Sequence, residues 1–161
     1  MKVALLIILL FLTSYHSKAE ERFLSHEEVP KSILSRIKEG SKHTVSQMHE
    51  QGISHFDYNE ASVKFLSEVI TDEHLHLSDN AKRILPEIWG AFLGEVIIEE
   101  LGGKWVKFGD QYAVLVSDSH LCFPMNKVHE QIANGQIDSI YAFYLSTARI
   151  ANEISSADDG A

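Results

Sequence analysis

The apolar pattern of this chain changes its period at Gly102-Gly103, and that change constrains the fold more than any other feature. Before the glycines, from Ser78 to Leu101, apolar residues recur at helical spacing and make the widest apolar face in the chain. After them, Lys104–Phe108 alternates polar and apolar residues, which is the pattern of a half-buried strand. A long helix followed directly by short alternating strands predicts an α+β fold.

The alternation continues in two more short segments, so the sequence predicts an antiparallel meander. Gly109-Asp110 and Ser117-Asp118-Ser119 are turn sequences, because glycine, aspartate and serine favour turns. Pro124 ends the last strand, since proline cannot donate a hydrogen bond to a neighbouring strand. The predicted strands are 104–108, 112–116 and 120–123. The expected architecture is amphipathic helices flanking one small three-stranded antiparallel sheet.

Helices are predicted on both sides of this sheet. Pro30 opens the first, because proline is tolerated in the first turn of a helix, and Gly52 ends it. Asp57 or Asn59 caps the second, and Asp57 with Glu60 three residues later has the spacing of a capping box. The remaining predicted caps are Ser78 or Asp79 for the third helix, Asn126 for a short fourth helix and Asp138 for the last.

Two features of the third helix affect how it can pack. Pro86 is expected to kink the helix or to mark its true start, since an interior proline loses a hydrogen bond and clashes with the preceding turn. Gly90 and Gly94 lie four residues apart and therefore share one face. Because glycine has no side chain, the sequence predicts that another backbone can approach this face closely.

The first 19 residues have the three parts of a secretory signal peptide. Met1 and Lys2 make a positive start, Val3–Leu12 is an unbroken apolar run, and Ser17-Lys18-Ala19 suits a cut after Ala19. The apolar run is short for a spanning helix, which needs about 20 residues. We expect export of a bacterial protein to the periplasm or beyond, without a lipid anchor, because Glu20 and not cysteine follows the cut. The alternative is an anchor helix that stays attached.

The predicted organisation is a signal peptide at 1–19, an irregular segment at 20–30, one α+β domain at 31–154 and a disordered tail at 155–161. Cleavage leaves 142 of the 161 residues, with 12 of the 14 basic residues and all 23 acidic ones, a formal charge of −11. A chain this acidic is poorly suited to binding nucleic acid or anionic lipid, because bound phosphates require Lys and Arg, and no nucleic-acid partner is expected. The acidic surface suits a basic partner, or serves solubility.

The single cysteine, Cys122, cannot form an internal disulfide. It lies between Leu121 and Phe123, an apolar context in which a free thiol is usually buried and inert. A reactive thiol would need an electropositive setting, for which His120 is the nearest candidate. The sequence favours the inert interpretation.

The strongest metal candidate is the pair His74 and His76, flanked by Asp72 and Glu73. In an extended segment, residues two apart project to the same side, so both imidazoles could reach one ion. A working site needs further ligands, and the spacing of the other histidines supplies none. The sequence favours a solvated acidic loop with two surface histidines, and no metal or cofactor is expected.

Carboxylates on the third helix are the other candidate for chemistry. Glu95 and Glu99 are four residues apart and could form an acid/base pair. Glu95 could equally accept a buried hydrogen bond, and Glu99 with Glu100 fits an ordinary exposed helix end. The sequence has neither a nucleophile elbow nor a phosphate-binding glycine loop, so no catalytic residue is assigned. Tyr141, Phe143 and Tyr144 have the spacing of helix core.

Several short motifs resemble an uncharacterised family of small bacterial proteins, known as a domain of unknown function. The motifs have the pattern GxxxGE…GGxW…FPxxKV…NGxxDS…FY and extend from Gly90 to Tyr144, with a further piece at 56–63. The resemblance covers about half to two-thirds of the mature chain. It implies a fold and no site, because the family has no agreed activity.

We therefore expect a non-enzymatic, exported binding protein. One specific form is an immunity-type inhibitor of a basic toxin, whose capture an acidic surface would accelerate. The rival is a hydrolase or metal-dependent enzyme that uses Glu95, His120 or the pair His74 and His76. Such an enzyme needs these residues gathered in one pocket. A structural accessory of the envelope is a third hypothesis, for which a large exposed apolar patch would be the sign.

Overall fold

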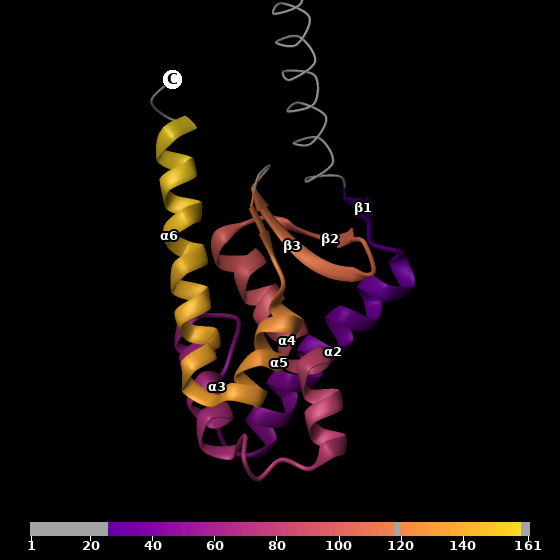
Figure 1. Ribbon diagram of the computed structural model, residues 1–161, viewed down its shortest axis with the longest axis vertical. Coiled ribbons are helices and arrows are strands. Elements are labelled where there is room, and N and C mark those ends of the chain that lie inside the picture. Colours follow the sequence, from indigo (N-terminus) through magenta and orange to yellow (C-terminus); the bar gives the residue numbers. More distant parts are fainter. Residues whose placement is uncertain (1–25, 118–119, 159–161) are drawn as a thin grey trace, which may run out of the picture.

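The computed structural model of the chain describes residues 26–117 and 120–158, which form five α-helices and one antiparallel sheet (Figure 1). The predicted α+β class is confirmed. The helices are α2 (Lys31–Glu50), α3 (Glu60–Glu73), α4 (Asp79–Leu101), α5 (Pro124–Asn134) and α6 (Ile140–Asp158), and the 3₁₀ turn η1 (Gly135–Asp138) joins the last two. The strands are β1 (Glu27–Glu28), β2 (Lys104–Phe108), β3 (Gln111–Ser117) and β4 (His120–Cys122).

The sheet has four strands and not the predicted three, because the segment expected to be irregular contributes β1. Strand order is β1-β2-β3-β4. Glu27 pairs with Lys107 and Glu28 with Val106, and the Lys107 ammonium lies 2.9 Å from the Glu27 carboxylate. Two residues are too few to show an alternating pattern, so this strand could not be predicted.

Three helix ends differ from the predictions. Helix α5 begins at Pro124 and not at Asn126, because proline is well suited to the first helical turn. Ser139, and not Asp138, caps α6: its Oγ accepts a hydrogen bond from the backbone N–H of Ala142 at 3.2 Å. Helix α6 continues to Asp158 through the start of the predicted tail. The predicted signal peptide and residues 159–161 lie outside the described residues.

Of the two residues predicted for each cap, Asn59 caps α3 and Ser78 caps α4, so the capping-box spacing of Asp57 and Glu60 does not mark the start of α3. The side chain of Asn59 accepts a hydrogen bond from the N–H of Ser62, and that of Ser78 accepts one from the N–H of Ala81. Pro86 lies inside α4, seven residues after its first residue, so it does not mark the start of the helix. None of the helices in 26–117 and 120–158 is both long and apolar enough to cross a bilayer.

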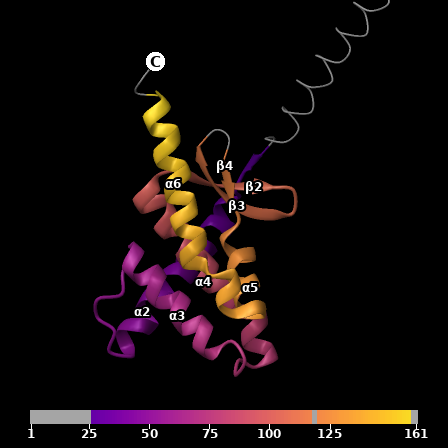
Figure 2. The ribbon, with the colours of Figure 1, turned by 60° about the vertical axis from the view of Figure 1, so that its left-hand side comes forward.

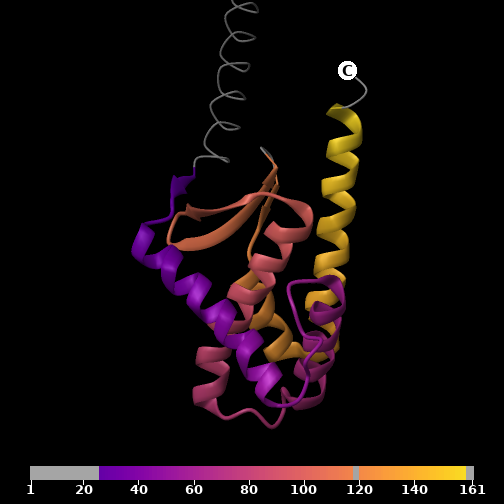
Figure 3. The ribbon, with the colours of Figure 1, turned by 180° about the vertical axis from the view of Figure 1, so that it is seen from behind.

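Helix α4 runs through the middle of the molecule, with α2, α5, α6 and the sheet around it (Figures 1 and 3). Its central residues are buried on every side, from Gly90 through Gly94 and again at Val96 and Ile97. One face of the sheet packs on this helical core through Trp105, Val114 and Cys122. The opposite face carries a second apolar cluster of Val106, Ala113 and Leu115 with Leu121 and Phe123.

The predicted close approach at the two glycines of α4 is present. A Cβ on Gly90 would lie 2.5 Å from the Cα of Met125 at the start of α5. A Cβ on Gly94 would lie 2.1 Å from the indole ring of Trp105 on β2. Atoms cannot approach so closely, so α5 and β2 occupy positions that only glycine permits.

A buried glutamine ties α3, α5 and α6 together. The Gln131 amide donates to the Ser67 carbonyl at 2.8 Å and to the Thr71 hydroxyl at 3.1 Å, and its oxygen accepts from the Ile140 N–H at 2.8 Å. The Ser67 and Ser139 hydroxyls are 3.0 Å apart beside it. Because buried polar groups without partners are costly, this network fixes the relative positions of the three helices.

Replacing Gly90 in α4 and Gly40 in α2 by alanine should have opposite effects on stability. Gly90→Ala is expected to lower the free energy of unfolding by about 1–3 kcal/mol through overpacking against Met125. Gly40→Ala on α2 is the matched control, because its Cβ would meet Ala91 at an ordinary 3.8 Å. Alanine's better helix propensity should then stabilise the protein by up to about 1 kcal/mol. Urea denaturation of the wild type and the two variants measures the free energy of unfolding. Equal changes in both variants would contradict the role of Gly90.

Candidate functional site

A groove runs between the first half of α4 and α5. Its middle hollow, about 450 Å³, is lined by residues of both helices, including Lys82, Glu87, Met125 and His129. A second hollow of about 250 Å³ shares Lys82 and His129 and ends at the α3–α4 connection. A third, about 190 Å³, shares Glu87 and Met125 and reaches α2. Because they share lining residues, these hollows adjoin one another, and together we call them the α4–α5 groove.

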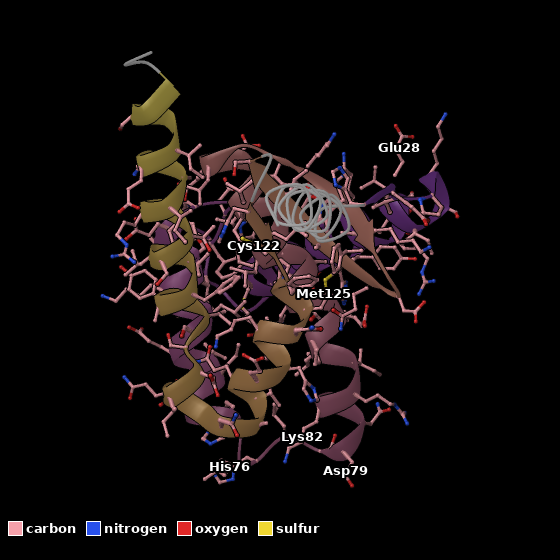
Figure 4. All side chains as sticks on the ribbon, turned by 45° about the horizontal axis from the view of Figure 1, so that its top comes forward. Glu28, His76, Asp79, Lys82, Cys122 and Met125 are labelled. Carbon is pink, nitrogen blue, oxygen red and sulfur yellow. The ribbon has the colours of Figure 1, made fainter. Side chains whose placement is uncertain are left out.

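The lining of the α4–α5 groove contains both basic and acidic side chains. Arg36, Lys82 and Arg83 line it, against the carboxylates of Asp79 and Glu87. In the described part of the chain, the ion pairs use only Lys107 and Lys127, so none of the three groove cations is neutralised by a direct contact. Figure 4 shows Lys82 and Asp79 together at one end of the molecule, with Met125 further along.

His74 lies in this groove, and His76 does not line it. The Nδ1–H of His74 donates to the Thr71 carbonyl at 2.8 Å, and the opposite edge of the ring packs over Gly135. The histidine that shares a hollow with His74 is His129 from α5, whereas His76 is exposed. Among the residues that the structure describes, no three His, Cys, Asp or Glu side chains are grouped to hold a metal ion.

The carboxylates of α4 point to separate partners. The Trp105 indole N–H donates to Glu95 Oε1 at 2.7 Å, so Glu95 serves as the acceptor that orients this ring. Glu99 is exposed. The hydrogen-bond interpretation of Glu95 therefore fits the structure, and an acid/base pair with Glu99 does not.

A second cluster joins the ends of α3, α4 and α6, and we call it the Tyr–Glu face: Glu60, Glu100, Tyr141, Tyr144 and Leu145. The Tyr144 hydroxyl donates to Glu100 Oε2 at 2.6 Å, and the Tyr141 hydroxyl donates to Glu60 Oε1 at 2.9 Å. Burial and the bond to Glu100 raise the pKa of Tyr144, and the bond to Glu60 raises that of Tyr141. Both tyrosines therefore stay protonated donors at neutral pH.

The sequence predicted that Tyr141 and Tyr144 lie in the core, but their hydroxyls also donate hydrogen bonds to carboxylates. Tyr144 is buried, whereas Tyr141 and Phe143 are only partly buried. The hydroxyl partners come from α3 and α4, which lie 81 and 44 residues away in the chain. Tyrosine where phenylalanine would suffice for packing was the one signal that such partners existed.

Cys122 is buried, in agreement with the sequence. Burial raises the pKa of its thiol, and its Sγ lies 3.7 Å from the Thr147 hydroxyl. Burial also lowers the pKa of His120, the neighbour proposed as its activator. Both effects oppose a thiolate–imidazolium pair, so the inert interpretation agrees with the structure.

The residues proposed for an enzyme lie in separate places. Glu95 is partly buried and contacts Trp105, and His120 is on β4 at the sheet. His74 and His76 belong to the α3–α4 connection, at the opposite end of the molecule from the sheet (Figures 1 and 2). The structure thus does not bring these candidate residues together in one pocket.

No protein-family model, curated protein or solved structure matches this chain. The resemblance to a family of small bacterial proteins therefore stays a prediction.

Removing the Tyr144 hydroxyl should change how stability depends on pH. The folded hydroxyl holds its proton to a higher pH than the unfolded one, whose pKa is 10.0. Its contribution to stability is therefore complete below pH 10 and is lost as the pH rises above it. Tyr144→Phe should cost roughly 1–2 kcal/mol at pH 7 and flatten the fall in stability above pH 10. Urea denaturation at several pH values measures the free energy of unfolding, with Tyr112→Phe as the control. If the free energy of Tyr144→Phe falls above pH 10 as steeply as that of the wild type, the prediction is wrong.

Proposed function

We propose that this protein is an exported, non-enzymatic binding protein whose Tyr–Glu face captures a basic protein partner. The observation that carries the proposal is how Glu60 and Glu100 are held. Each accepts a hydrogen bond from a tyrosine hydroxyl, and within the described residues neither forms an ion pair. The face thus presents two fixed carboxylates whose charge is not neutralised by a cation of the same chain.

Fixed carboxylates lower the cost of binding. A flexible surface glutamate loses rotamer freedom when a partner's Lys or Arg pairs with it, whereas Glu60 and Glu100 are already oriented. Tyr141, which contacts Glu60, is partly exposed, and Leu145, one helical turn further along α6, is 43% exposed. Of these side chains, tyrosine is the type that is enriched in protein–protein interfaces.

The charge of the whole chain supports the same partner. Without the predicted signal peptide the chain carries a formal charge of −11. A field of this sign accelerates the encounter with a basic protein and weakens as salt increases. An immunity-type inhibitor of a basic toxin in the periplasm is the form of this proposal that uses both the predicted export and the acidic face.

Affinity capture with charge-neutral variants tests this function. The immobilised protein is exposed to envelope extract at low salt and eluted with high salt, and Glu60→Gln/Glu100→Gln is compared with the wild type. We expect a basic protein bound in a defined stoichiometry, and a loss of roughly tenfold in affinity, about 1.4 kcal/mol, in the double variant.

The matched control is Glu68→Gln/Glu73→Gln, which removes the same charge from exposed positions of α3 outside the face. It should bind as the wild type does. Equal weakening in both double variants would show that only overall charge matters, and an acidic or absent partner would overturn the proposal. Circular dichroism confirms that each variant is folded.

A further inference from the structure

The junction between α5 and η1 contains an asparagine that is directly followed by a glycine. Of the five asparagines in the chain, only Asn134 has this neighbour. Asn134 is the last residue of α5 and is exposed, whereas Gly135, the first residue of η1, is buried and has a φ of +67°. Because this left-handed conformation favours glycine and ends the helix, the fold itself places a glycine after Asn134.

An asparagine before a glycine is chemically labile. The backbone nitrogen of the glycine gives up its proton and attacks the asparagine Cγ, and the new N–Cγ bond closes a five-membered succinimide while the Cγ–Nδ2 bond breaks and releases ammonia. Water then opens the ring at either carbonyl, which leaves aspartate or isoaspartate. The net reaction consumes one water and releases one ammonia. Glycine favours the attack because no Cβ shields its nitrogen.

The folded protein restrains both reacting groups of this pair. The Gly135 N–H donates to the Gln131 carbonyl at the end of α5. The Asn134 side-chain amide donates to Asp138 Oδ2 at 2.7 Å. At the Asn134 ψ of −2°, the Gly135 nitrogen lies beside the Asn134 nitrogen and not beside Cβ, so the Cα–C bond must rotate before that nitrogen can reach Cγ. The reaction therefore requires a local opening of the junction.

We propose that Asn134 is a site of spontaneous deamidation, and that the hydrogen bond from its side chain to Asp138 is the gate that limits the rate in the folded protein. Asp138 is itself held in place, because the Lys127 ammonium donates to its other oxygen, Oδ1, at 3.0 Å. Lys127 belongs to α5 and Asp138 to η1. The side chain of Asn134 is thus restrained for as long as α5 and η1 stay together.

Deamidation changes the junction in which it occurs. A carboxylate at position 134 replaces the amide that donates to Asp138, so two negative charges face each other where a 2.7 Å hydrogen bond stood. Isoaspartate also routes the main chain through Cβ and lengthens it. The N–H of Ile140, two residues after Asp138, donates to the buried oxygen of Gln131 at 2.8 Å. We therefore expect the modification to loosen the network that joins α3, α5 and α6.

Peptide mass spectrometry tests the proposal. The purified protein is incubated at mildly alkaline pH, where the glycine nitrogen loses its proton more readily, either folded or unfolded in urea, and is digested at intervals. We expect conversion at Asn134 in the folded protein at a rate roughly tenfold below that in urea, because local opening limits it. Asn80 and Asn152 are exposed helical positions without a following glycine, and as internal controls they should remain unchanged.

Two variants test whether Asp138 is the gate. Asp138→Ala removes the acceptor of the Asn134 amide and should accelerate conversion in the folded protein roughly threefold to tenfold, as expected for the loss of one hydrogen bond. Glu130→Ala is the matched control, because it removes the other carboxylate bound to Lys127, at 3.0 Å, and leaves the Asn134 bond intact. It should react as the wild type does.

Three results would overturn the proposal. They are a folded wild type in which Asn134 reacts no faster than the two control asparagines, a wild type that reacts at one rate in buffer and in urea, and equal rates in Asp138→Ala and Glu130→Ala. Circular dichroism shows whether each variant is folded. If Asp138→Ala does not fold, Asp138→Ser, whose side chain is shorter than that of aspartate, takes its place.

Discussion

The contact of α4 with its neighbours is the constraint on which the rest of the structure depends. Gly90 and Gly94 allow the start of α5 and the indole ring of Trp105 to lie directly against the helix backbone. A helix that is buried on all sides through its middle must supply a surface to every element around it. Two missing side chains therefore determine the positions of α5 and β2, and with them the sheet.

Both candidate surfaces follow from this central helix. Its first half forms one wall of the α4–α5 groove, and α5 forms the other because Met125 is held against Gly90. Its C-terminal end carries Glu100 to the hydroxyl of Tyr144. The buried amide of Gln131 then fixes α5 and α6 on α3, which places Tyr141 close to Glu60. Thus a buried polar network orients an exposed pair of carboxylates.

The candidate site could be predicted less well than the fold. Cys122 was correctly expected to be buried, and Glu95 was correctly offered as a hydrogen-bond acceptor, because each lies within an apolar segment. The groove and the Tyr–Glu face could not be predicted, since each is made by residues from different helices. His74 shows the difference: the nearest histidine in the sequence is His76, but the histidine that shares its hollow is His129.

The sequence by itself determined the α+β class, the central helices and the β2–β3–β4 meander, because apolar period and turn residues are local properties. It also determined the acidic charge. Only the tertiary structure decided that Glu27 and Glu28 form a fourth strand, that α6 extends beyond the sheet, and which carboxylates the tyrosine hydroxyls bind. These features depend on contacts between residues far apart in the chain, and such contacts leave no periodic signal in any one segment.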